Sequence, residues 1–161
     1  MKKLTKFIII FFIASLFGNN AIYAAGSSGG DENYNTSLYK KGKKLVLRAK
    51  KLEKKNKIEK AEKLYLDALD KFEKAYAKNK KSADILNYLG YTLRKTGNYE
   101  KAEIFYLKGL ELDAGHLGIN EYLGELYVQT NRINLAEKRL EVLNGCKCEE
   151  YEELKELIEN N

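Results

Sequence analysis

The chain has 161 residues and carries 29 Lys or Arg against 23 Asp or Glu, a formal net charge of +6. This length allows one domain with a thin, continuous core. Two cysteines and a single histidine are too few for a zinc site with four such ligands. The absence of proline and of alternating β-branched residues predicts an all-α protein.

Residues 1–24 have the layout of a secretory signal peptide. Three lysines precede an uncharged apolar run over residues 7–17, and a cleavage site follows at about Ala24. The apolar run is about half of the roughly 20 residues that a membrane span needs. We therefore expect an exported protein, periplasmic or secreted; an uncleaved anchor is the alternative. Cleavage would remove three lysines and lower the formal charge from +6 to +3.

The next segment, residues 25–37, is rich in Gly, Ser and Asn. Such a composition cannot bury enough apolar surface to offset the entropy lost on ordering, so a flexible linker is predicted here. From Leu38 onward the apolar residues follow a helical period. We expect residues 38–161 to form the folded domain.

Residues 42–75 predict a first helical hairpin. Its apolar and small residues fall at helical spacing, at Leu45, Ala49, Leu52, Ala61, Tyr65 and Ala68. The same period continues through Leu69, Phe72 and Tyr76, so we expect the second helix of this hairpin to be longer than the first repeat requires.

Two further hairpins are predicted over residues 83–116 and 117–148, because they repeat each other at a spacing of 34 residues. Leu89-Gly90 is answered by Leu123-Gly124, and Ala102 by Ala136. A glycine inside a helix costs about 1 kcal/mol relative to alanine, so Gly90 and Gly124 indicate close contact between the two helices of each hairpin. The segments 96–98 and 130–132 supply the turns, with Asn131 taking the left-handed conformation that glycine takes readily.

A last helix is predicted over residues 149–159. Tyr151, Leu154, Leu157 and Ile158 give it one apolar stripe, and glutamates cover the remaining surface. Such a helix can cap the end of a repeat array, and we expect it to contact Leu143.

The 34-residue pattern resembles the tetratricopeptide repeat family, which has Leu-Gly at the seventh and eighth positions of each repeat and small residues at later ones. The resemblance implies a helical-hairpin solenoid of about three hairpins and a C-terminal capping helix. The stretch from Leu143 to Lys155 is also similar to the tails of small exported bacterial tetratricopeptide proteins. The resemblance implies no catalysis; it implies a concave groove that holds extended peptides or helices.

Carried over by register, eight residues would face that groove. They are Asn87, Tyr91, Arg94, Lys95, Glu121, Glu125, Val128 and Gln129. Tyr91 is expected to be the exposed aromatic residue among them. The set holds only Asn87 and Lys95 of the residue types that make a clamp for a free C-terminal carboxylate, and not the full set, so a peptide segment of moderate affinity is the expected ligand.

Cys146 and Cys148 leave several alternatives open. They are either two thiols in a tight turn or a disulfide across it; a redox-active pair and intermolecular pairing are rarer outcomes. His116 falls in a turn with no nucleophile at a recognisable spacing, and a solvated turn residue is favoured over a general base. The chain contains no motif for phosphate, zinc-protease or nucleophile chemistry, so we expect no enzyme, no cofactor and no metal.

The charge distribution suggests a second function. Residues 40–63 contain twelve Lys or Arg against three Glu, whereas residues 141–161 contain seven Glu against two Lys. The basic segment would adsorb to anionic lipid or polymer, although a solvated helix face is the simpler interpretation. Export argues against a nucleic acid partner. The sequence therefore favours a non-enzymatic scaffold of the cell envelope that binds a protein or peptide partner, with self-association through the solenoid ends also open.

Overall fold

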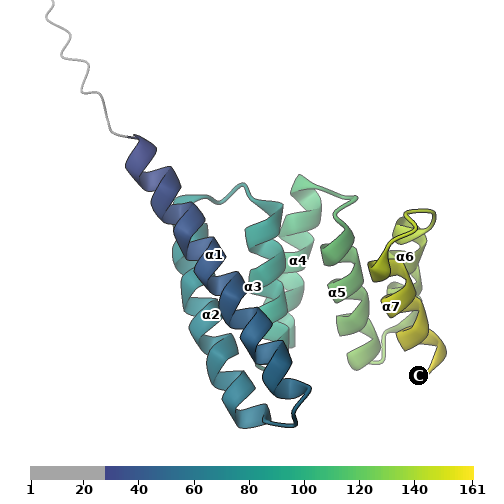
Figure 1. The fold of residues 1–161 in the computed structure, drawn as a ribbon. Coiled ribbons are helices and arrows are strands. Elements are labelled where there is room, and N and C mark those ends of the chain that lie inside the picture. Colours follow the sequence, from purple (N-terminus) through teal and green to yellow (C-terminus); the bar gives the residue numbers. More distant parts are fainter. Residues whose placement is uncertain (1–27) are drawn as a thin grey trace, which may run out of the picture.

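The computed structural model describes residues 28–161, which form three antiparallel helical hairpins and a final helix (Figure 1). The predicted signal peptide and residues 25–27 lie outside this part. The helices follow one another in chain order across the view, from α1 on the left to α6 and α7 on the right. Their bounds are α1 Ser28–Glu53, α2 Ile58–Lys78, α3 Ala83–Lys95, α4 Tyr99–Leu112, α5 Leu117–Gln129, α6 Ile133–Leu143 and α7 Glu149–Glu159. The expected all-α helical-hairpin solenoid is confirmed.

The first helices of the hairpins form one layer. Helix α1 contacts α3, α3 contacts α5, and α5 contacts α7, while α2, α4 and α6 each pack against the first helix of their own hairpin. We call the layer of α1, α3, α5 and α7 the inner layer. No helix in the described part is both long and apolar enough to cross a membrane.

Helix α1 begins earlier than expected, at Ser28. The flexible linker predicted over residues 25–37 is therefore wrong for residues 28–37. Once a helix is nucleated, each further residue adds one backbone hydrogen bond, and no proline interrupts this segment. Leu38 is buried in the core and fixes the helix from which these residues extend.

The predicted extension of the second helix is confirmed, since α2 continues to Lys78. Phe72 and Ala75 in this extension are fully buried. The Phe72 ring stacks on Tyr88 of α3 at a centroid distance of 5.0 Å. The extra turns of α2 thus pack against α3 and join the hydrophobic core of the first hairpin to the second hairpin.

Gly90 and Gly124 both lie where another helix packs closely against their own, but only at Gly90 is it the expected helix, the second one of the same hairpin. A Cβ atom on Gly90 would lie 2.4 Å from the Tyr106 ring, across the same hairpin, as predicted. At Gly124 a Cβ atom would instead lie 2.5 Å from Leu154 of α7. The expected contact within the third hairpin is wrong because the capping helix packs on α5 and inserts Leu154 there.

The turn between α5 and α6 uses Asn131 in the left-handed conformation, with φ 57°, where the preceding hairpin uses Gly97 with φ 81°. This equivalence agrees with the prediction. The turn between α6 and α7 contains a disulfide between Cys146 and Cys148, with their Cα atoms 5.2 Å apart. Of the alternatives left open by the sequence, the structure contains the intramolecular bridge.

Candidate functional site: a cleft on the inner layer

A cleft of about 430 Å³ opens on the inner layer near the first turns of α3 and α5. Side chains from α1, α3, α5, α7 and the α4–α5 turn line it. Its lining combines tyrosines, carboxylates, one lysine and one amide, namely Tyr39, Lys43, Asp84, Asn87, Tyr88 and Glu150 among others. This mixture suits a polar segment with some apolar surface.

The structure separates the eight residues predicted to face the groove. Only Asn87 and Glu121 line the cleft. Lys95 and Glu125 are half-buried, and Gln129 is exposed outside the cleft. Tyr91, Arg94 and Val128 are buried. Register alone thus located the correct helices but not the accessible side chains.

Tyr91 is 3% exposed, so the prediction that it is the exposed aromatic of the groove is wrong. Its ring lies 5.9 Å from Tyr65 and 4.8 Å from Tyr122, centroid to centroid. The Lys50 ammonium of α1 lies 5.1 Å from the centroid of the Tyr91 ring. Burial raises the pKa of Tyr91, and its hydrogen bond with Tyr65 raises it further. Tyr91 therefore joins neighbouring hairpins instead of facing a partner.

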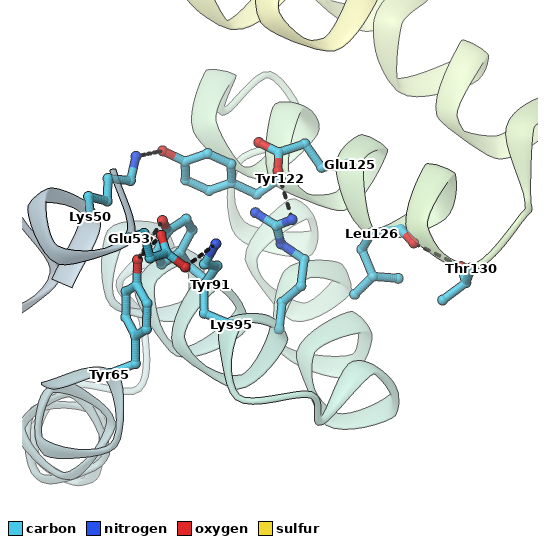
Figure 2. A network of polar contacts seen from close by, with 10 residues as sticks. Lys50, Glu53, Tyr65, Tyr91, Lys95, Tyr122, Glu125, Leu126 and Thr130 are labelled. Carbon is cyan, nitrogen blue, oxygen red and sulfur yellow. Dashed lines mark hydrogen bonds and ion pairs between the residues drawn. The ribbon is translucent and has the colours of Figure 1, made fainter. Parts of the chain in front are cut away.

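The polar groups around Tyr91 form a network that links the first hairpin to the next two (Figure 2). The Tyr65 hydroxyl donates to Glu53 at 2.7 Å, and Lys95 of α3 pairs with the same carboxylate at 2.7 Å. Lys50 donates to the Tyr122 hydroxyl of α5 at 3.4 Å. These contacts hold α1 against α3 and α5, and so fix one wall of the cleft.

Arg94 is also internal, at 4% exposed. Its guanidinium pairs with Glu125 of α5 at 2.7 Å. The same group lies over the rings of Tyr91 and Tyr122, at 5.5 Å and 5.8 Å from their centroids. The expectation that Arg94 faces a partner is wrong, because Glu125 and the two tyrosines enclose it. Its role is to join α3 to α5.

Asn87 is the member of the predicted set that both lines the cleft and has an unpartnered buried atom; the Nε atom of Arg94 also lacks a hydrogen-bond partner, but Arg94 lies outside the cleft. Asn87 is 6% exposed, and its Oδ1 atom has no hydrogen-bond partner within the described part of the chain. A buried polar atom without a partner costs about 1–3 kcal/mol. Such a group is unusual in folded proteins and needs an explanation.

A second buried asparagine shows the structural alternative. Asn120 donates to the carbonyl oxygens of Ala114 and His116, both at 3.0 Å, and accepts from Arg139 at 3.3 Å. Both the Nδ2 and the Oδ1 atom of Asn120 therefore have hydrogen-bond partners, and the Nδ2 bonds hold the α4–α5 turn in place. Asn87 has no equivalent partner for Oδ1, which makes it the leading candidate for binding a ligand.

Glu121 belongs to a group of three carboxylates with Glu125 and Glu153, whose oxygen atoms lie within 4.8 Å of one another. Burial, followed by a hydrogen bond with Glu153 and the charge of Glu125, raises the pKa of Glu121 to about 9. Glu121 thus keeps its proton at neutral pH and can donate it to Glu153 of α7. Glu125, the third member of this group, pairs with Arg94.

His116 is the N-terminal cap of α5. Its Nδ1 atom accepts from the backbone N–H of Ile119 at 3.2 Å, and its Nε2 atom lies 3.5 Å from Asp84. The predicted turn position is correct, but the side chain is half-buried instead of solvated.

Sequence reasoning missed the cleft residues contributed by the first and last helices, Tyr39, Lys43 and Glu150. Tyr39 and Lys43 are four residues apart and therefore share one face of α1. Their spacing could have placed them together. The approach of α1 to α3, and of α7 to α5, has no signal in the repeat register.

Comparison with known proteins agrees with this geometry. A family model described as "Tetratricopeptide repeat" matches residues 46–114. The Yersinia enterocolitica type III secretion translocator chaperone SycD is similar in structure, with a TM-score of 0.56, 18% identity, and coverage of 74% of this chain and 89% of that one. No curated protein sequence matches the chain.

Two further solved structures are similar and contain peptides. SycD in complex with a peptide of the translocator YopD has a TM-score of 0.51 at 21% identity, over 73% of this chain and 86% of that one. The second domain of human RPAP3, in complex with the HSP70 peptide SGPTIEEVD, has a TM-score of 0.50 at 19% identity, over 76% of this chain and 97% of that one. At these identities the likeness concerns the fold.

Proposed function

We propose that this chain is a non-catalytic binding module that holds a segment of another protein. The premise of this proposal is that residues 46–114 belong to the tetratricopeptide repeat family. The segment lies in the cleft formed by α1, α3, α5 and α7. Support comes from two structural neighbours that are described with bound peptides, SycD with a YopD peptide and RPAP3 with an HSP70 peptide. The cell envelope is the proposed location, on the strength of the signal-peptide pattern at residues 1–24.

One observation carries the proposal, the unpartnered amide oxygen of Asn87 at the cleft. A peptide segment carries hydrogen-bond donors on its backbone and its side chains, and the Asn87 amide oxygen supplies an acceptor for one of them. Binding would therefore satisfy an atom that the unbound fold leaves without a hydrogen bond. This gain on binding offsets the cost of keeping a buried polar group in the free protein.

The variant Asn87→Leu tests the proposal because it keeps the size of the side chain and removes the amide. We expect the free energy of unfolding to stay the same or rise by about 1 kcal/mol, since an unsatisfied buried group is lost. Partner recovery from an extract of the native host is expected to fall at least fivefold. Affinity purification with quantitative mass spectrometry, alongside urea unfolding, measures both quantities.

Gln129→Leu is the matched control, since it also replaces an amide on the inner layer but lies outside the cleft. Its partner recovery should equal that of the unmodified chain. Equal recovery with Asn87→Leu would contradict the proposal, and a large loss of stability in that variant would assign Asn87 a structural role.

Adsorption to an anionic surface stays a prediction. Helix α1 carries an exposed stripe that suits it, Lys40, Lys44, Arg48 and Lys51. These residues lie outside the cleft, so a partner segment and such a surface would not compete for the same side chains.

A further inference from the structure

We infer that the segment held in the cleft is basic and that it places a lysine or arginine side chain between Tyr88, Asn87 and the surrounding carboxylates. This inference rests on the proposed function and adds the chemistry of the partner. Three independent features of the cleft lead to it: its charge, its aromatic wall and its unpartnered acceptor.

Carboxylates reach the cleft from three different parts of the chain. Asp84 comes from the start of α3, Asp113 from the α4–α5 turn and Glu150 from the start of α7. The basic groups in the lining are Lys43 and His116, and His116 lies 3.5 Å from Asp84. With Glu121, which also lines the cleft, four carboxyl groups face one lysine and one histidine. A cationic group gains from this field, whereas an anionic segment is repelled.

The aromatic wall already accommodates an ammonium group. Lys43 of α1 lies over the rings of Tyr39 and Tyr88, at 5.4 Å and 5.6 Å from their centroids. Cations bind aromatic faces at such distances, by about 0.5–1 kcal/mol in exposed sites and more when water is excluded. Lys43 thus already places one ammonium group on this wall in the free protein, so the wall is compatible with a cation.

Asn87 supplies the observation that is independent of the charges. Its Oδ1 atom is a hydrogen-bond acceptor without a partner, on a side chain that is 6% exposed and borders the cleft. An ammonium or guanidinium group carries only donors and has no acceptor. A basic side chain therefore matches the amide oxygen and the carboxylates at once, while a carboxylate ligand matches neither.

A peptide titration tests the inference. Three short Gly/Ser/Ala peptides with blocked ends differ only at a pair of central positions, which hold lysine, glutamine or glutamate. Each is added to the ¹⁵N-labelled full chain at low ionic strength, and amide chemical shifts report binding. We expect the lysine peptide to shift the amides of Asn87, Gly118 and Glu150 in a saturable manner, and the glutamate peptide to leave them unchanged.

Substitutions distinguish binding of the peptide in the cleft from non-specific attraction to the acidic surface of α7. The double variant Asp84→Asn and Glu150→Gln is expected to weaken binding of the lysine peptide roughly tenfold, because two carboxylates at the cleft are lost. Glu152→Gln, on the same helix but outside the cleft, should leave the affinity unchanged. Equal weakening by both changes would assign the binding to the surface of α7 and overturn the inference.

The peptide results also distinguish this inference from the proposed function. Glutamine or glutamate peptides that bind at the cleft as tightly as the lysine peptide would overturn the basic specificity and leave the proposed function in place. Absence of any shift at the cleft with the lysine peptide would overturn it as well. The proposed function is judged separately, by partner recovery with Asn87→Leu.

Discussion

Replacing Arg94 with alanine is expected to lower the free energy of unfolding by about 3 kcal/mol. The guanidinium is 4% exposed and pairs with Glu125 at 2.7 Å between α3 and α5. Removing it leaves a carboxylate without its counter-charge and opens space beside Tyr91 and Tyr122. Urea unfolding at neutral pH, followed by circular dichroism, measures the loss.

Arg132→Ala provides the matched control. Arg132 also pairs with a glutamate of a neighbouring hairpin, Glu103 at 2.8 Å, but its side chain is 36% exposed. Exposed ion pairs contribute about 0–1 kcal/mol, so this change should cost much less. If the two variants lose the same stability, the assignment of Arg94 as an internal link between α3 and α5 is wrong.

The second large effect is a change in pH dependence, expected for Glu121→Gln. The pKa of Glu121 is about 9 in the folded chain against an ordinary value of 4.5. The folded chain therefore holds a proton that the unfolded chain releases, and the contribution of Glu121 to stability falls as the pH rises from about 4.5 to about 9. Glutamine is neutral throughout and preserves the hydrogen-bond donor toward Glu153.

We expect the Glu121→Gln variant to match the unmodified chain at pH 4 and to exceed its free energy of unfolding by a few kcal/mol at pH 9, given roughly 1.4 kcal/mol per unit of pKa difference. Urea unfolding at a series of pH values measures both curves. Glu156→Gln, an exposed change on α7, should leave the slope unaltered. An unchanged slope in Glu121→Gln would show that its proton is not retained on folding.

Much of the fold follows from local chemistry that the sequence displays. The 34-residue spacing places Leu89-Gly90 and Leu123-Gly124 on equivalent helices, and Gly97 and Asn131 both adopt the left-handed turn conformation. The start of α1 at Ser28 could not be predicted in the same way. A Gly- and Ser-rich composition favours disorder in isolation, whereas here the segment continues a helix that the buried Leu38 already anchors.

The candidate site was only partly predictable, because exposure depends on contacts between distant helices. The register placed Asn87 and Tyr91 on the same layer, but Tyr65 and Tyr122 enclose Tyr91, while Asn87 remains at the cleft. The contrast with the fully bonded Asn120 is likewise invisible in the sequence. Which asparagine lacks a partner is decided by the neighbouring helices.

Site-specific photo-cross-linking tests whether the partner lies in the cleft. A benzoylphenylalanine at Leu117, which is 39% exposed and lines the cleft, is compared with one at Leu107, which is 44% exposed on the outward side of α4. We expect irradiation in the native host to link a partner at position 117 and not at position 107. Cross-linking at position 107 alone would contradict it.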